Sequence, residues 1–119
     1  MVLHRVWKFL CVAGVLFLAA CEDVPERVER HYERGMALLE SDDPEGAALE
    51  FRNALRLDEN HVPSRFQVAR VYEREGEMRA AFMNYRLVAE LDDQHLAARK
   101  RLGEIFLLAE EIDQAAGYI

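Results

Sequence analysis

The chain has 119 residues and a formal net charge of −7, with 22 acidic and 15 basic side chains. About a hundred residues follow the first twenty, enough for one small domain. Residues 21–119 hold 13 basic and 22 acidic side chains, a balance of −9. This charge argues against a nucleic-acid partner and against a protein lying flat on an anionic membrane, because both need a basic face.

The first twenty residues have the order of a secretory signal peptide. Arg5 and Lys8 supply positive charge, residues 9–18 form an apolar run, and two alanines follow at the place that a signal peptidase cleaves. The run is shorter than the roughly 20 apolar residues of a membrane-spanning helix. We therefore expect residues 1–20 to be removed.

The segment Leu18-Ala19-Ala20-Cys21 ends this peptide and resembles the lipobox of bacterial lipoproteins. The resemblance implies that Cys21 is acylated, that residues 21–27 form a tether, and that the protein faces the periplasm from a membrane of the bacterial cell envelope. Glu22, rather than Asp, after the cysteine favours the outer membrane over the inner. A plain secretory peptide with an incidental cysteine is the alternative. With Cys11 removed and Cys21 acylated, no cysteine is left for a disulfide or a thiolate metal site.

An offset of 34 residues superimposes the rest of the chain on itself, which indicates an internal repeat. Small or apolar residues share the register. The aligned sets are Gly35, Ala69 and Gly103; Leu38, Tyr72 and Phe106; Ala47, Ala81 and Ala115; and Phe51, Tyr85 and Ile119. The aligned pairs are Ala54 and Val88, Leu57 and Leu91, and Asp58 and Asp92.

Each period predicts a helix, a tight turn and a second helix, because apolar residues recur at helical spacing on both sides of turn segments such as SDDPEG and EGEM. The aligned alanines let paired helices approach closely, with Phe51 and Tyr85 filling the space beside them. A bulky residue at Ala81 would therefore be costly. We expect helices over residues 25–40, 44–57, 63–75, 78–91, 95–109 and from 112 onward.

The register resembles the tetratricopeptide repeat, whose 34-residue signature has a small residue at position 8, an aromatic at 11, Ala at 20 and an aromatic at 24. The resemblance implies an all-α fold, a right-handed α-solenoid of helix-turn-helix repeats. The repeats would cover 28–61, 62–95 and, incompletely, 96–119. A helical bundle with an accidental period is the alternative. The departures are His31, Arg65 and Arg99 in place of Trp, Leu38 in place of the first aromatic, and Glu59 and Asp93 in place of Pro.

The third repeat stops at Ile119, midway through its second helix. A solenoid needs a capping element with a polar outer face. We therefore expect the chain to be the N-terminal piece of a longer array. A folded domain whose last helix frays or dimerises is the alternative.

No catalytic constellation is apparent. The sequence has no Gly-rich phosphate loop, HExxH motif or calcium loop. His61 and His95 occupy equivalent turns and are interpreted as polar turn residues, too far apart to share a metal ion. Ser41 and Ser64 are interpreted as helix-start residues. We expect a non-enzyme with no metal or cofactor apart from the lipid on Cys21, and no small-molecule substrate is evident.

The resemblance implies a concave groove lined by the first helix of each repeat. Basic groove positions in an acidic chain favour acidic or carboxylate-terminated segments. A competing interpretation of Arg70 and Arg74 is solvent-facing pairing with Glu73 and Glu77. The family's groove positions also include Leu39, Glu73 and Arg101. The candidate peptide-binding residues are Tyr32, Met36, Phe66, Arg70, Arg74, Lys100 and Glu104.

These features favour a membrane-anchored scaffold that binds a protein or peptide partner in the envelope. Lipid-anchored repeat proteins of this kind resemble those that serve assembly or export of a pilus, an outer-membrane protein or an exopolysaccharide/exosortase system. The N-terminal repeat arm of a larger envelope enzyme is one alternative. A self-associating spacer with an empty groove is another.

Overall fold

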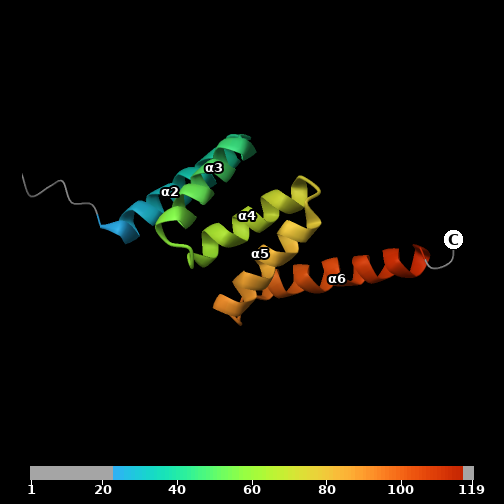
Figure 1. The fold of residues 1–119 in the computed structure, drawn as a ribbon. Coiled ribbons are helices and arrows are strands. Elements are labelled where there is room, and N and C mark those ends of the chain that lie inside the picture. The colour runs from blue at the N-terminus through green and yellow to red at the C-terminus, as the bar shows by residue number, and fades with distance from the viewer. Residues whose placement is uncertain (1–22, 117–119) are drawn as a thin grey trace, which may run out of the picture.

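The computed structural model describes residues 23–116. The predicted signal peptide, the lipobox-like segment with Cys21, and Ile119 lie outside the described residues. Within them the chain forms five helices, α2 (Val24–Glu40), α3 (Pro44–Leu57), α4 (Val62–Arg74), α5 (Met78–Leu91) and α6 (Leu96–Ala116). Each helix packs against the next in chain order (Figure 1). The all-α prediction is confirmed, and the bounds predicted for the first four helices are correct to within one residue.

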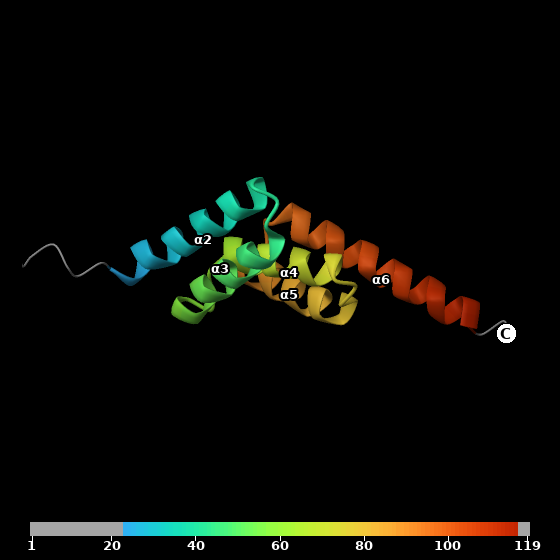
Figure 2. The same cartoon turned by 90° about the horizontal axis from the view of Figure 1, so that it is seen from above.

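The predicted break between residues 109 and 112 is wrong, because α6 is continuous from Leu96 to Ala116. The turns after α2 and α4 contain residues that interrupt a helix: Asp42 has φ of 62° and Gly76 has φ of 80°. The segment Ala-Glu-Glu-Ile over residues 109–112 contains neither Gly nor Pro, and Ala and Glu favour the helix. The C-terminal half of α6 consequently projects beyond the other helices in both views (Figures 1 and 2).

The core consists of small and aromatic side chains between successive helices. One cluster contains Ala47, Phe51 and Val68. The other contains Ala69, Ala81, Tyr85, Val88 and Ala98. Ala47, Ala81, Phe51 and Tyr85 are all fully buried, which confirms the predicted close approach of the paired helices.

Ring contacts in the first helical hairpin recur 34 residues later in the second. Tyr32 on α2 lies against Phe51 on α3, with ring centroids 5.9 Å apart. Phe66 on α4 lies against Tyr85 on α5, with centroids 5.6 Å apart. The 34-residue register therefore holds for contacts between side chains as well as for residue type.

The turns after α3 and α5 are also built alike. Oδ1 of Asp58 accepts a hydrogen bond from the backbone N–H of Asn60 at 3.0 Å, and Nδ1 of His61 accepts one from the N–H of Ser64 at 3.4 Å. The equivalent bonds join Gln94 to Asp92 at 3.0 Å and Ala98 to His95 at 3.2 Å. His61 and His95 are thus polar turn residues, as predicted, and each satisfies a backbone donor at the start of the next helix.

The helix-start interpretation holds for Ser64 but is wrong for Ser41. Ser64 lies in the first turn of α4, with its hydroxyl 2.8 Å from Nδ1 of His61. Ser41 instead ends α2, where its hydroxyl donates to the carbonyl of Leu38 at 3.1 Å. Asp43 caps α3 by accepting from the N–H of Gly46 at 2.9 Å. Asp43 directly precedes Pro44 and is the N-cap of α3.

Candidate functional site

A hollow of about 540 Å³ opens between α4 and α6, with α5 contributing to its lining. We call it the α4–α6 groove. Its volume lies within the roughly 300–1,000 Å³ of typical ligand pockets. Its lining residues are Phe66, Arg70, Glu73 and Arg74 from α4, Met78 and Tyr85 from α5, and Ala97, Lys100, Arg101 and Glu104 from α6.

Helical spacing explains why each wall presents these side chains together. Phe66, Arg70 and Arg74 recur at intervals of four residues, so they lie on one face of α4. Val68 and Val71 lie on another face of α4 and are buried against neighbouring helices. The α4 wall of the groove is thus the solvent-facing side of a helix whose other faces pack in the core.

The groove brings together five of the seven candidate binding residues. They are Phe66, Arg70, Arg74, Lys100 and Glu104. Tyr32 and Met36 are not among its lining residues; they pack against the core cluster around Phe51. The Tyr32 ring also lies edge-on to His61, with centroids 5.6 Å apart. A binding role for Tyr32 and Met36 stays a prediction, whereas their packing around Phe51 is observed.

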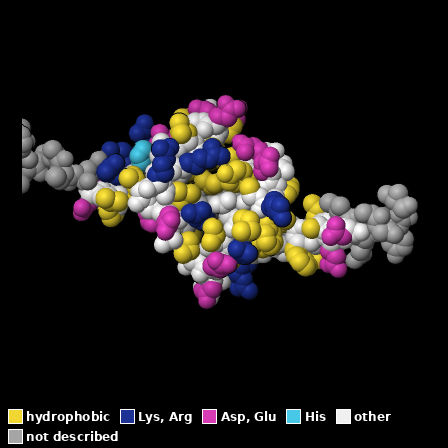
Figure 3. Space-filling model, in the orientation of Figure 1, with side chains coloured by type: hydrophobic (Ala, Val, Ile, Leu, Met, Phe, Trp, Pro, Cys, Tyr) yellow, Lys and Arg dark blue, Asp and Glu magenta, His cyan; other side chains and the backbone are white. Residues whose placement is uncertain are grey.

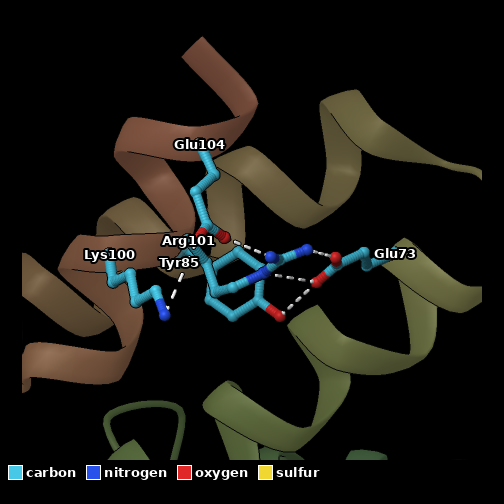
Figure 4. Close-up of polar contacts among 5 residues, drawn as sticks. All are labelled: Glu73, Tyr85, Lys100, Arg101 and Glu104. Atoms are coloured by element: carbon cyan, nitrogen blue, oxygen red, sulfur yellow. Dashed lines mark hydrogen bonds and ion pairs between the residues drawn. The ribbon is translucent and has the colours of Figure 1, made fainter. Parts of the chain in front are cut away.

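A polar network crosses the groove from α4 to α6 (Figure 4). Oε2 of Glu73 accepts hydrogen bonds from the Tyr85 hydroxyl at 2.8 Å and from Nε of Arg101 at 3.2 Å. Arg101 also forms ion pairs with Glu73 and Glu104. Nζ of Lys100 lies 3.8 Å from Oε1 of Glu104. The network ties the two walls together and fixes their separation.

Tyr85 has a fully buried position beneath this network. Burial raises the pKa of its hydroxyl above the ordinary value of 10.0, and the nearby charge of Arg70 opposes this effect. The hydroxyl is therefore protonated at neutral pH. It acts as the hydrogen-bond donor that orients the Glu73 carboxylate.

Three cations of the groove are only weakly engaged by the protein itself. Nη1 of Arg70 donates to the side-chain oxygen of Gln67 at 3.3 Å. The Arg74 side chain makes no hydrogen bond or ion pair within residues 23–116. The Lys100 side chain is 75 % exposed. The Glu73 carboxylate is engaged by Arg101 and Tyr85, and in this part of the chain neither Arg70 nor Arg74 pairs with Glu73 or Glu77.

The sequence analysis did not identify Met78, Tyr85 or Ala97 as groove residues. Tyr85 was interpreted only as a space-filling core residue, because the 34-residue register aligns it with Phe51. The Tyr85 hydroxyl could have indicated a polar contact in the groove, because a buried Tyr hydroxyl usually has a hydrogen-bond partner. Met78 and Ala97 lie at the starts of α5 and α6. Whether they line the groove depends on how the helices pack against one another.

The described part of the chain was also searched for metal sites and for membrane-spanning helices. Residues 23–116 contain no group of three or more His, Cys, Asp or Glu side chains that could hold a metal ion. Nor is any helix within that range long and apolar enough to cross a membrane. A scan against protein-family models finds no match, and a search among curated proteins finds no significant relative.

Proposed function

We propose that the chain is a tetratricopeptide-type repeat protein that binds an acidic peptide segment in the α4–α6 groove. The repeat interpretation is supported by the recurrence of ring contacts and turn hydrogen bonds at the same 34-residue offset that aligns the sequence. In such a protein, stacked helical hairpins form a right-handed solenoid, and the first helix of each repeat lines the binding surface.

The observation that carries the proposal is the set of weakly engaged cations on an otherwise acidic protein. Arg70, Arg74 and Lys100 line one groove, although the whole chain has a net charge of −7. A peptide carboxylate can accept hydrogen bonds from Arg guanidinium groups in two parallel contacts. The contacts among Glu73, Tyr85 and Arg101 already hold the groove walls together in the free protein. Binding therefore has to order fewer side chains, which favours affinity.

The groove also offers apolar contact. Phe66 is partly buried, with its ring 4.6 Å from that of His95 between centroids. Met78 lies at the groove and is 38 % exposed. A ligand with an apolar side chain beside acidic residues would therefore meet both kinds of surface. We expect such a segment to bind more tightly than a uniformly acidic one.

Replacing Arg70, Arg74 and Lys100 together by Ala tests the groove. A fluorescently labelled peptide of Asp, Glu and Leu residues serves as the probe, and a peptide with Lys in place of the acidic residues is its control. We expect the parent protein to bind the acidic probe, and the triple variant to lose at least about tenfold in affinity. Binding to the parent should weaken with salt, because exposed charges are screened over about 10 Å at 0.1 M salt.

A matched variant separates the groove from the overall charge. Replacing Arg27, Arg56 and Arg86 by Ala removes the same charge from exposed positions on α2, α3 and α5. This control should bind the probe nearly as the parent does. Equal binding by the parent and the groove variant would contradict the proposal. Phe66→Ala should weaken binding with little change in salt dependence, because it removes apolar contact rather than charge.

We further propose that the protein works in the bacterial cell envelope, facing the periplasm, as a scaffold in assembly or export of a component such as a pilus, an outer-membrane protein or an exopolysaccharide/exosortase system. The support is the lipobox-like sequence ending in Cys21. In this role the chain is a non-enzymatic binding protein that needs no cofactor beyond its covalent lipid. Its partner is a protein or peptide, rather than nucleic acid or a small-molecule substrate.

Cys21→Ser tests the anchor. A single acyl chain binds a membrane only marginally, so stable anchoring depends on the multiple chains that a lipidated N-terminal cysteine carries. The variant should therefore appear in the soluble fraction after cell lysis. Continued sedimentation with membranes after a high-salt wash would contradict lipid anchoring through this residue, and Cys11→Ser provides the control.

A further inference from the structure

One face of α6 is covered by no other helix in residues 23–116. Phe106 and Leu107 on α6 are 61 % and 59 % exposed. Gly103, one turn before Phe106, is open as well, since a Cβ built there would meet no atom within 4 Å apart from its own helix. The face therefore combines a projecting aromatic ring with a hollow beside it.

The same face is filled in the two helical hairpins. At Gly35 on α2, the equivalent of Gly103, a Cβ would lie 2.5 Å from the Phe51 ring of α3. Ala69, the equivalent on α4, is fully buried in one cluster with Tyr85 of α5. In each hairpin the covering helix runs antiparallel to the helix it covers (Figure 1). By this comparison, the open face of α6 is shaped to receive an antiparallel helix that places an aromatic ring over Gly103.

Charge is distributed unevenly along α6. Its N-terminal part contains Arg99, Lys100 and Arg101, and its C-terminal part contains Glu110, Glu111 and Asp113. On the side shown in Figure 3, the projecting half carries hydrophobic and acidic side chains. Acidic groups at a helix C-terminus are unfavourable for the helix dipole, whereas the N-terminus of an antiparallel neighbour compensates them.

The charges and the ring share one stripe of the helix. Arg99 and Asp113 each stand seven residues from Phe106, and seven residues are two helical turns, which return to the same face. Arg99 is exposed and donates from Nη1 to the carbonyl of Asp93 at 3.3 Å. Its remaining donors are free to bond a carboxylate. Asp113 is exposed.

We propose that two copies of the chain pair through antiparallel α6 helices related by a two-fold axis near Phe106. Phe106 of each copy packs over Gly103 of the other, as Phe51 packs over Gly35 within the first hairpin. Arg99 of each copy lies opposite Asp113 of the second copy. The pairing therefore compensates the basic N-terminal part and the acidic C-terminal part of each α6 helix. Lys100 and Glu104 lie at the edge of this face, beside Leu107 and off the stripe that contains Arg99, Phe106 and Asp113.

Charge exchange tests the pairing. The purified full chain, in a mild detergent, is studied by sedimentation over a range of protein concentrations. One helix pair covers less than the about 1,600 Å² of a standard interface, so we expect a weak dimer that dissociates on dilution. Arg99→Asp and Asp113→Arg should each weaken dimerisation at least about tenfold, since each places like charges opposite one another twice. The double variant should restore the parent's dimerisation.

Further variants examine the ring and the hollow. Phe106→Ala removes the ring and Gly103→Leu fills the hollow, so both should weaken dimerisation. Arg86→Asp is a matched charge reversal on α5 and should leave dimerisation unchanged. Circular dichroism of each variant verifies its helix content, and restoration by the double exchange separates lost pairing from misfolding.

Three results would overturn the proposal. The first is a parent chain that stays monomeric at every concentration, as it would if its own following segment or a different protein covered the face. The second is a dimer insensitive to the charge reversals, as association through the apolar segment of residues 9–18 would be. The third is a double exchange that fails to restore a dimer although its helix content is intact. None of these results depends on peptide binding in the groove.

Discussion

Gly35 and the ring of Phe51 lie in direct contact where α2 crosses α3. A Cβ placed on Gly35 would be 2.5 Å from Cε1 of Phe51, a distance that non-bonded carbon atoms do not reach. The Phe51 side chain is fully buried among Ala47, Val68 and their neighbours, so it can yield only if the cluster repacks. The absence of a side chain at Gly35 therefore permits the close packing of the first hairpin.

Gly35→Ala and Gly103→Ala should change stability in opposite directions. Ala favours a helix over Gly by about 1 kcal/mol. At Gly35 the clash should outweigh this gain and lower the free energy of unfolding by about 1–3 kcal/mol. At Gly103 a Cβ would meet no neighbouring atom, so the substitution should raise the free energy of unfolding through the higher helix propensity of Ala. Urea unfolding in dilute protein measures both variants, and a loss of stability at both positions would contradict the difference in packing.

Ala81→Leu should destabilise the second hairpin. Ala81 is fully buried beside Tyr85 and Val88, and three additional carbon atoms would overpack this cluster. We expect a loss of about 1–3 kcal/mol in the free energy of unfolding. Ala37→Leu, at an exposed position of α2, is the control and should stay within about 0.5 kcal/mol of the parent. Similar effects of the two substitutions would show that the cluster tolerates added volume.

Tyr85→Phe should alter the dependence of stability on alkaline pH. The pKa of the Tyr85 hydroxyl is raised in the folded protein, whereas in the unfolded chain it returns to about 10.0. The neutral hydroxyl thus contributes stability that is present below pH 10 and is lost as the pH rises toward the folded-state pKa. The Phe variant lacks this group, so its urea midpoint should fall less steeply above pH 10. If the urea midpoints of the two proteins fell equally steeply above pH 10, the raised pKa of Tyr85 would be contradicted. The absorbance of the phenolate directly measures the pH range in which the Tyr85 hydroxyl loses its proton.

Glu73→Gln should change stability and binding in opposite directions. The substitution weakens the contact with Arg101 and leaves the amide to accept from Tyr85, so we expect a loss of about 1 kcal/mol in stability. It also removes a negative charge from a groove that binds the acidic probe, and affinity should rise. Glu75→Gln makes the same charge change at an exposed position on the neighbouring turn. If the two variants gave equal affinities, the carboxylate of Glu73 would have no influence on the ligand.

Sequence periodicity predicted the hairpins because their helix boundaries depend on local signals. Proline at the start of α3, Gly76 at positive φ and the regular spacing of apolar residues determine where these helices begin and end. Ala47 and Ala81 were predicted to be buried because a small residue recurs wherever two helices approach. Local chemistry of this kind is visible in a single sequence.

Features that depend on tertiary packing were not predicted. The continuity of α6 through residues 109–112 reflects helix-forming residues without a stop signal, where the register alone suggested a turn. Glu73 and Arg101 are 28 residues apart, and their pairing follows from how α6 lies against α4. Tyr32 and Met36 occupy groove positions by register, yet they pack around Phe51 because α3 lies beside them.

The end-to-end order of packing has a mechanical consequence. The main contacts within residues 23–116 join successive helices, and Arg101 also joins α6 to Glu73 of α4, so a disturbance at α2 should reach α6 chiefly through the helices between them. The described chain should behave as an elastic strip, in which small rotations at each interface add into a change of curvature. Amide hydrogen exchange should be slowest in α3, α4 and α5, each of which packs against a helix on both sides, and fastest in the projecting end of α6. A pull on the chain would open the strip one interface at a time.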